Sequence, residues 1–229
     1  MIDLEKRFIG IGGEFLSPPS VLKNKLSKIK AIIFDWDGVF NDGVKDTNYS
    51  SSFSEGDAMG TNLMRFSFYL SKGEIPTTSI FTGALNDIAQ YLAKREHFDY
   101  LVYKCINKGA AFEDFLIQNN LLPEEVAFCF DDVLDLPIAE SCGLRFYINS
   151  AGRPMFEDYL LRHGLYDYRT GNLGGQNAVR EVTELIMGLL GNYDDVVKHR
   201  LAFTDVYQRY WDQRNSVTTQ IIEWKTTDH

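Results

Sequence analysis

An apolar run that ends in two closely spaced carboxylates constrains the fold of this chain more than any other stretch. Residues 31–34, Ala-Ile-Ile-Phe, have the continuous hydrophobic character of a strand buried on both faces of a sheet. Asp35 and Asp37 follow, and then Gly38. Because side chains alternate along a strand, the two carboxylates can share one side, where a cation such as Mg²⁺ would offset their repulsion. The pattern predicts a ligand-binding edge of a parallel sheet, although a lone Asp-x-Asp is more often a strand end whose acids cap the next turn.

The composition fits one large α/β domain with extensions, or two small domains. The chain has 229 residues, 45% of them hydrophobic and 24% charged, and no run has the length of a membrane span. The first residues lack the layout of a secretion signal, so we expect a cytoplasmic protein. The net charge of −9 argues against a nucleic-acid partner. The three cysteines form no CxxC pair, which argues against a disulfide framework or a zinc site.

Strands and helices alternate through the middle of the chain. After the first strand, the hydrophobic pattern predicts strands at residues 77–81, 100–105, 126–130 and 144–148, and helices at 57–70, 84–95, 110–119, 136–141 and 179–190. Residues 44–53 are expected to form a short hairpin. The alternation predicts an α/β fold with a doubly wound parallel sheet.

Four of these strands are followed by polar groups of the kind that phosphoryl transfer requires. In chain order the groups are Asp35 and Asp37, Thr82, Lys108, and Asp131, Asp132 and Asp135. In a parallel sheet these strand ends share one edge. There one carboxylate can attack phosphorus, a second can act as acid and base, a hydroxyl can hold phosphoryl oxygens, and a lysine with Mg²⁺ can offset negative charge. Each group alone has a plainer explanation, such as a helix cap or a solvated lysine, but the set predicts phosphoryl transfer.

The same residues resemble the four motifs of the haloacid dehalogenase (HAD) superfamily. The similarity is closer to its 3-deoxy-manno-octulosonate-8-phosphate phosphatase branch, and to the related phosphatase domain of some acylneuraminate cytidylyltransferases. Residues 34–43 match the pattern Phe-Asp-x-Asp-Gly-Val-x-x-Asp-Gly of that branch, and residues 174–181 match Gly-Gly-x-x-Ala-Val-Arg-Glu. The resemblance covers about residues 29–192, so we expect a phosphatase domain there, an N-terminal extension at 1–28 and a C-terminal helical extension at 193–229.

The resemblance implies a Mg²⁺-dependent phosphomonoester hydrolase that acts through an aspartyl phosphate on a small phosphorylated sugar or sugar acid. In this comparison Asp35 is the nucleophile and Asp37 is the general acid and base. Thr82 and Gly83 bind the phosphoryl group, and Lys108 steadies Asp35 and the phosphate.

The resemblance also implies a set of metal ligands. Asp35 and Asp131 are expected to bind Mg²⁺ through their carboxylates, and Asp37 through its backbone carbonyl. Asp132 and Asp135 are expected to act through metal-bound water or through contacts to the ligands.

Two departures from the branch leave a second function open. Phe130 stands where a glycine usually precedes the last acidic motif, and this ring would crowd the metal loop. Ala84 follows Thr82-Gly83, where sugar-acid phosphatases often have Arg or Glu, which removes a substrate contact. The alternative is a structural or regulatory module with the same fold. A receiver domain is disfavoured because its acidic pair precedes the phosphorylated Asp, whereas here Asp131 and Asp132 come after Asp35.

The spacing of the motifs predicts a capless domain, since the segments between them have room for no inserted domain. In the resembled branch a tetramer covers the open site, so the resemblance implies a homo-oligomer, with a tetramer favoured. A C-terminal stripe of apolar residues is expected to pack at the subunit interface, or alternatively over residues 1–30 of its own chain. Its members are Leu201, Phe203, Val206, Tyr207, Tyr210 and Trp211.

Overall fold

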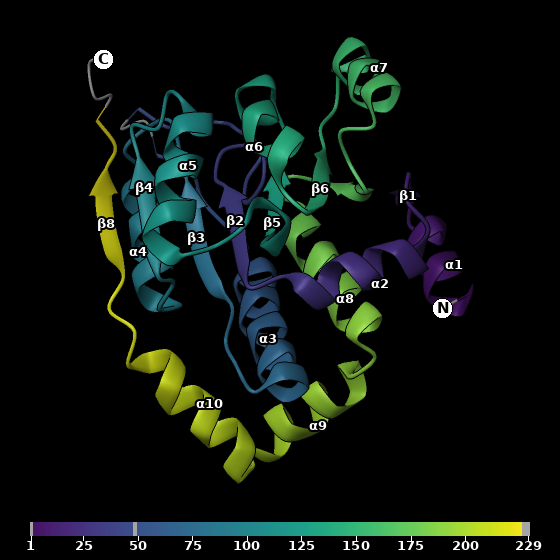
Figure 1. The fold of residues 1–229 in the computed structure, drawn as a ribbon, viewed down its shortest axis with the longest axis vertical. Helices are drawn as coiled ribbons and strands as arrows, with labels where there is room; N and C mark the ends of the chain where they lie inside the picture. Colours follow the sequence, from purple (N-terminus) through teal and green to yellow (C-terminus); the bar gives the residue numbers. More distant parts are fainter. Residues whose placement is uncertain (1, 48–49, 226–229) are drawn as a thin grey trace.

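The computed structural model describes residues 2–47 and 50–225 of the chain. Within this part, the centre is an eight-stranded sheet with helices on both faces (Figure 1). Neighbouring strands are parallel except for β1 and β7. In sheet order the strands are β1 (Glu14–Phe15), β7 (Tyr168–Leu173), β6 (Leu144–Asn149), β5 (Val126–Phe130), β2 (Ala31–Asp35), β3 (Thr77–Phe81), β4 (Tyr100–Tyr103) and β8 (Gln220–Glu223). The expected doubly wound α/β architecture is confirmed.

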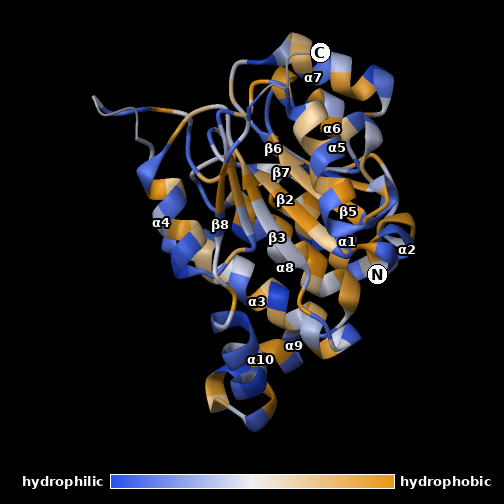
Figure 2. Ribbon diagram, turned by 60° about the vertical axis from the view of Figure 1, so that its left-hand side comes forward, coloured by the Kyte–Doolittle hydropathy of each residue, from blue (hydrophilic) through white to orange (hydrophobic). Residues whose placement is uncertain are grey.

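Helices cover the sheet in two layers. The first layer contains α2 (Pro19–Lys28), α3 (Glu55–Lys72), α4 (Asp87–Arg95) and α8 (Ala178–Leu190). The second contains α5 (Lys108–Asn119), α6 (Leu136–Ser141) and α7 (Pro154–His163). Strand β2 serves both layers, because Ile32 and Phe34 face the first and Ala31 and Ile33 face the second. Figure 2 shows the resulting contrast between hydrophobic strands and helices with mixed surfaces.

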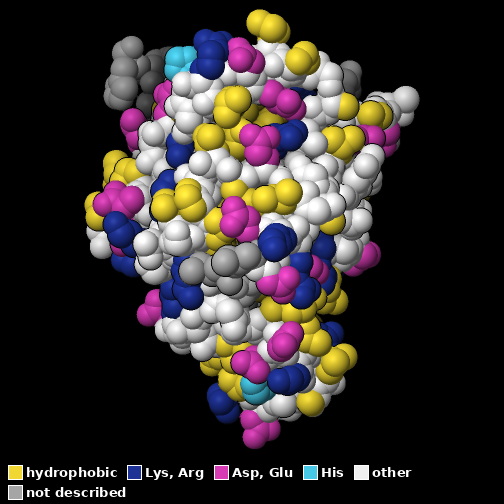
Figure 3. All heavy atoms as spheres, turned by 90° about the vertical axis from the view of Figure 1, so that its right-hand side faces the viewer, with side chains coloured by type: hydrophobic (Ala, Val, Ile, Leu, Met, Phe, Trp, Pro, Cys, Tyr) yellow, Lys and Arg dark blue, Asp and Glu magenta, His cyan; other side chains and the backbone are white. Residues whose placement is uncertain are grey.

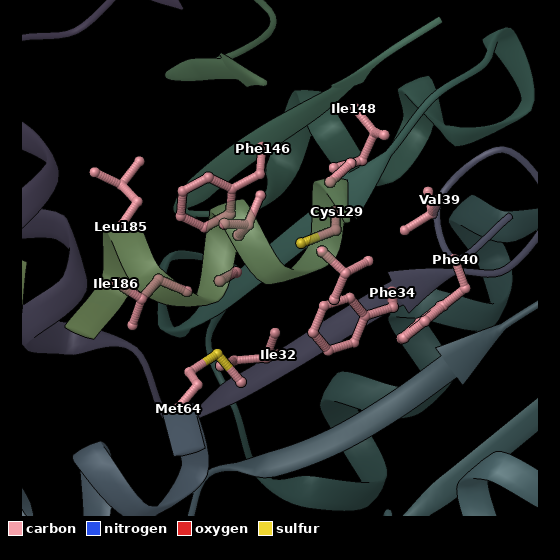
Figure 4. Close-up of a cluster of buried hydrophobic side chains, with 14 of the residues drawn as sticks. Ile32, Phe34, Val39, Phe40, Met64, Cys129, Phe146, Ile148, Leu185 and Ile186 are labelled. Atoms are coloured by element: carbon pink, nitrogen blue, oxygen red, sulfur yellow. The ribbon is translucent and has the colours of Figure 1, made fainter. Parts of the chain in front are cut away.

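Phenylalanine and aliphatic side chains fill the space between the sheet and the first layer. Figure 4 shows Phe34 and Phe40 close together, with Phe146 and Ile186 nearby. The rings of Phe34 and Phe40 are 5.3 Å apart, and both side chains are fully buried. This packing anchors the turn after β2, which carries Asp37, to the core of the molecule.

Side-chain caps set the starts of the helices next to the site. Ser54 accepts a hydrogen bond from Asp57 N at the start of α3. Asn86 accepts from the backbone amides of Ile88 and Ala89 at the start of α4. Asn107 caps α5 in the same way, so that Lys108 is the first residue of that helix. The caps explain why these helices begin at Glu55, Asp87 and Lys108.

Several elements are not evident from the sequence pattern. They are α1 (Ile2–Gly10), β1, β7, α7 and β8, together with short 3₁₀ turns at Pro123–Glu125 and Val133–Asp135. The expected hairpin at 44–53 is wrong for its described residues, since 44–47 and 50–53 contain no strand and residues 48 and 49 lie outside the described part. Instead Asp46 N donates to Ser50 O, which closes a loop.

Part of the C-terminal stripe packs against its own chain. Helices α9 (Tyr193–Ala202) and α10 (Asp205–Asn215) lie against α3 and α8 of the same chain (Figure 1). Tyr207 and Tyr210 are fully buried beside Phe66, whereas Leu201 is 81% exposed. The buried part of the stripe therefore covers α3 and not residues 1–30.

No helix in the described ranges is long and apolar enough to cross a bilayer. On the face in Figure 3, basic and acidic side chains are interspersed, with hydrophobic side chains scattered among them.

Candidate active site

A cavity of about 470 Å³ lies at the carboxyl ends of the central strands. Its lining includes all but one of the residues that the sequence analysis singled out: Asp35, Asp37, Gly83, Lys108, Asp131, Asp132 and Asp135. Thr82 does not line the cavity. Its side chain is buried, and its hydroxyl oxygen lies 3.4 Å from Ala84 N, which can donate to it.

Lys108 joins two of the buried carboxylates. Its Nζ lies 2.5 Å from Asp35 Oδ1 and 2.5 Å from Asp135 Oδ1. Burial alone would lower the pKa of Lys108, but the charges of Asp35 and Asp135 outweigh burial and raise it. Burial, and then the nearby Asp135 and Asp131, raise the pKa of Asp35 against the opposing charge of Lys108. A cationic lysine thus holds the expected nucleophile in place.

Three carboxylates form a group that fits a hard cation. Single oxygens of Asp35, Asp131 and Asp135 all lie within 4.8 Å of one another. Burial, and then the charge of Asp135, raise the pKa of Asp131 to about 7 against the opposing charge of Arg153. Carboxylate oxygens are the ligands that Mg²⁺ prefers, so the donor set fits this ion. Asp135, expected in a supporting role, belongs to this group, and the side chain of Asp37 does not.

The carboxylate of Asp37 is held by two residues of the following loop. Ser51 Oγ donates to its Oδ1 at 2.7 Å, and Lys45 Nζ lies 2.8 Å from its Oδ2. The Ser51 hydroxyl in turn accepts hydrogen bonds from Trp36 Nε1 and Asn86 Nδ2. Both carboxylate oxygens of Asp37 are therefore held in place beside the cavity.

Asp135 and Gly38 shape the loop that carries Asp131. The Oδ2 atom of Asp135 accepts from the backbone amides of Asp131 and Asp132. Gly38 has φ +83°, and a Cβ on it would lie 2.0 Å from Asp131 Oδ2. Only glycine permits both this backbone conformation and this close approach.

Phe130 does not crowd the acidic loop. Its ring is buried in the second helical layer, stacked on Phe128 with the ring centroids 5.7 Å apart and close to Tyr147. The next residue, Asp131, points to the opposite side of the strand end. Phenylalanine in place of the usual glycine is therefore accommodated at position 130, because its ring packs in the hydrophobic core.

The Gly-Gly segment at residues 174 and 175 packs against the turn that carries Asp37 and Gly38. A Cβ on Gly174 would lie 2.0 Å from Gly38 O, so the backbone of this segment packs directly on the turn after β2. Glu181 holds the segment, because it accepts hydrogen bonds from Gly171 N and Asn172 N. The match at residues 174–181 thus has a structural reason.

Sequence reasoning missed three residues of the site, Lys45, Ser51 and Arg153. Lys45 and Ser51 belong to the loop that was expected to be a hairpin. Arg153 Nη1 lies 2.8 Å from Asp131 Oδ2 and 2.7 Å from Asp131 O. A single signal was available for Arg153, namely Gly152 and Pro154 on either side of it, which indicate a fixed turn and a helix start.

Comparison with known proteins places the chain among phosphatases of similar sequence and fold. No protein-family model matches it. The chain is 29% identical over 175 residues to the 3-deoxy-D-manno-octulosonate 8-phosphate phosphatase KdsC of Escherichia coli (strain K12), covering 75% of this chain and 86% of the relative.

Two solved structures share this fold. A Legionella pneumophila protein assigned to HAD superfamily hydrolases of subfamily III A is 27% identical, with a TM-score of 0.65 over 80% of this chain and 95% of its own. The cobalt-bound deoxy-D-mannose-octulosonate 8-phosphate phosphatase (YrbI) of Haemophilus influenzae is 26% identical, with a TM-score of 0.61 over 74% of this chain and 93% of its own. The chain is therefore similar in sequence and fold to phosphatases and hydrolases of the haloacid dehalogenase superfamily, and it resembles the 3-deoxy-D-manno-octulosonate 8-phosphate phosphatase branch.

Proposed function

We propose that this chain is a Mg²⁺-dependent phosphomonoester hydrolase that forms an aspartyl phosphate on Asp35. The observation that carries the proposal is the buried contact of Lys108 with Asp35 and Asp135 next to the acid group. A carboxylate beside a lysine and a hard cation is suited to attack a phosphoryl group, because both cations offset the charge of that group.

The reaction has two steps that this chain's own residues can perform. In the first, an oxygen of Asp35 forms a bond to phosphorus, the ester bond breaks, and Asp37 gives a proton to the leaving oxygen. In the second, Asp37 takes a proton from water, whose oxygen attacks the acyl phosphate, releases inorganic phosphate and restores Asp35. Ser51 and Lys45 support this role because they hold both carboxylate oxygens of Asp37.

The metal site is proposed on the donor set. The carboxylates of Asp35 and Asp131, with Asp135 beside them, would hold the ion, and Asp37 would contribute its backbone carbonyl. Bound Mg²⁺ would draw electron density from the phosphoryl oxygens. The cobalt-bound relative from Haemophilus influenzae supports a divalent cation. Gly83, which lines the cavity, would bind the phosphoryl group, and the buried hydroxyl of Thr82 would hold this turn through its contact with Ala84 N. Asp132 would lie at the outer edge.

The proposed substrate is a small phosphorylated sugar or sugar acid. The relatives from Escherichia coli and Haemophilus influenzae are named as phosphatases of 3-deoxy-octulosonate 8-phosphate, and the cavity of about 470 Å³ is large enough for a molecule of that kind. Ala84 lines the cavity and brings no charge. A similar substrate with a different sugar is therefore within the proposed class.

The proposal also covers organisation and location. We assign the reaction to residues 29–192, flanked by the two extensions, in a cytoplasmic homotetramer. Exposed apolar residues support contacts between subunits, since Leu201 is 81% exposed and Val44 is 69% exposed. Light scattering measures the mass directly.

The test is a screen of phosphorylated sugars and 2-keto sugar acids with Mg²⁺, with phosphate release as the readout. We expect release from at least one sugar acid phosphate and none after chelation. Asp35→Asn is the control for contaminating phosphatases. If no substrate is hydrolysed and Mg²⁺ does not raise the melting temperature of chelator-treated protein, the structural or regulatory module replaces this proposal.

A further inference from the structure

Arg153 lines the cavity and is a cation of the site that lies outside the motif residues given in the sequence analysis. It directly precedes α7, and its side chain reaches the end of β5, where Nη1 lies 2.8 Å from Asp131 Oδ2 and 3.2 Å from Asp132 Oδ2. Its side chain is 32% exposed, and that of Asp131 is 3% exposed. The partly exposed guanidinium therefore pairs with a buried carboxylate from the solvent-facing side of the cavity.

Arg153 is held there independently of the charge on Asp131. Its Nη1 also donates to the backbone carbonyl of Asp131 at 2.7 Å. Gly152, with φ +85°, turns the chain before Arg153, and Pro154 starts the helix after it. A fixed backbone and a backbone acceptor keep the positive charge next to the acid group when a metal ion occupies that group.

Lys108 and Arg153, the two cations of the site, contact different carboxylates of the acid group. Lys108 contacts Asp35 and Asp135, and Arg153 contacts Asp131. With all three acids ionised, one net negative charge remains among these five side chains, and a divalent cation turns it into one net positive charge. Without Arg153 the metal-loaded group would be neutral. The positive charge of Arg153 thus attracts a phosphate dianion to the metal-loaded group, and the same charge repels the metal ion.

We propose that Arg153 sets the balance between metal affinity and phosphate affinity, weakening the first and strengthening the second. The inference rests on the proposed function, because it takes Asp35, Asp131 and Asp135 as the site of Mg²⁺. Arg153 acts through Asp131 and through the field of its charge, and is a positioning residue. A purely structural role predicts a different result, since loss of a residue that only orients Asp131 weakens both affinities together.

The test is calorimetry on chelator-treated protein, first with Mg²⁺ and then with inorganic phosphate on Mg²⁺-saturated protein. In Arg153→Gln we expect Mg²⁺ to bind about three- to tenfold more tightly and phosphate about three- to tenfold more weakly, as for loss of one partly exposed charge. Arg153→Lys keeps the charge and is expected to lie close to the wild type in both. Arg162→Gln, which removes an exposed arginine from α7, the helix that follows Arg153, is expected to change neither.

Each outcome decides the inference. Tighter Mg²⁺ binding together with weaker phosphate binding in Arg153→Gln supports it, and any other pattern of the two affinities overturns it. Binding is measured without turnover, so a wild-type protein that binds Mg²⁺ and phosphate but hydrolyses nothing overturns the proposed function alone. A wild-type protein that binds neither ligand overturns both.

Discussion

The hydroxyl of Ser51 donates a 2.7 Å hydrogen bond to Oδ1 of Asp37. The same hydroxyl accepts from Trp36 Nε1 at 2.8 Å and from Asn86 Nδ2 at 2.9 Å. Trp36 is fully buried, and Asn86 caps α4, so the orientation of Asp37 is tied to the core and to a helix start. One loop serine thus links the expected acid to two fixed parts of the fold.

Replacing Ser51 tests this link. In Ser51→Ala we expect turnover of an alkyl phosphate to fall about tenfold or more, which is part of the rate factor of about 10²–10⁴ that a general acid contributes. Turnover of an activated aryl phosphate should fall less, because its leaving group needs little protonation. The unpaired Trp36 N–H should lower the free energy of unfolding by about 1–3 kcal/mol. Rates on both substrates and urea unfolding measure the two effects. Ser52→Ala, at an exposed neighbour, is the control, and equal losses on both substrates would contradict the role of Ser51.

Asp35→Asn tests the nucleophile. The amide is nearly isosteric and cannot form the acyl phosphate, so turnover should fall at least about a thousandfold. The melting temperature in chelator should not fall, because the substitution removes the charge of one of three crowded carboxylates and so reduces their repulsion. Lys108 still has its ion pair with Asp135. Asp158→Asn, at an exposed acid on α7, is the matched control. Full activity in Asp35→Asn would refute the assignment.

Asp57 predicts a pH dependence of stability that is separate from catalysis. Its buried carboxyl accepts from Arg180 N at 2.7 Å, and burial raises its pKa from 3.8 to about 6. The folded state holds the proton more tightly than the unfolded state, so the stabilisation is complete below about pH 4 and is lost as the pH rises through 6. By pH 7 the difference amounts to about 3 kcal/mol.

Urea unfolding between pH 4 and 7 measures this effect. Asp57→Asn is expected to flatten the fall in the free energy of unfolding across that range, and the exposed control Asp158→Asn is expected to leave it unchanged. A wild-type protein whose stability rises steadily from pH 4 to 7, with the same slope in Asp57→Asn, would contradict the prediction.

Tyr210 tests how far the C-terminal helices stabilise the rest of the chain. Its ring is fully buried, 5.0 Å from the Phe66 centroid, and its hydroxyl donates to Asn62 O at 2.9 Å. We expect Tyr210→Ala to cost about 3–5 kcal/mol of unfolding free energy and Tyr210→Phe about 1 kcal/mol. Leu201→Ala, at an exposed position, should cost less than about 0.5 kcal/mol. If Tyr210→Ala unfolds like the wild type, α10 contributes little to stability.

The central strands and the acidic site could be predicted because their signals are local. The run at residues 31–34 is buried on both faces and is therefore uniformly apolar. Asp35 ends β2, Asp131 follows β5 directly, and Lys108 starts the helix after β4, so the rule that parallel strands share a carboxyl edge brings them together. No knowledge of the loops is needed for either inference.

The remaining parts depend on contacts between distant residues. Strand β7 reads Tyr-Arg-Thr-Gly-Asn-Leu, and Glu181, which lies on a later helix, accepts hydrogen bonds from its Tyr168 hydroxyl and its Asn172 side chain. Ser51 matters only because a loop brings it to Asp37, and Arg153 only because its turn faces β5. Tyr207 and Tyr210 form a regular stripe, but the sequence does not identify the surface that they cover.

The pairing of β8 with β4 has a consequence for the order in which the molecule is completed during synthesis. Strand β8 covers the edge of β4 in a parallel register from Tyr100 to Tyr103, whereas β1 covers the other edge of the sheet beside β7. The ribosome delivers β1 before its partner but delivers β8 more than a hundred residues after β4. Until Gln220–Glu223 have emerged, the hydrogen-bonding groups of β4 form an open edge, which is the kind of surface that invites mispairing between nascent chains.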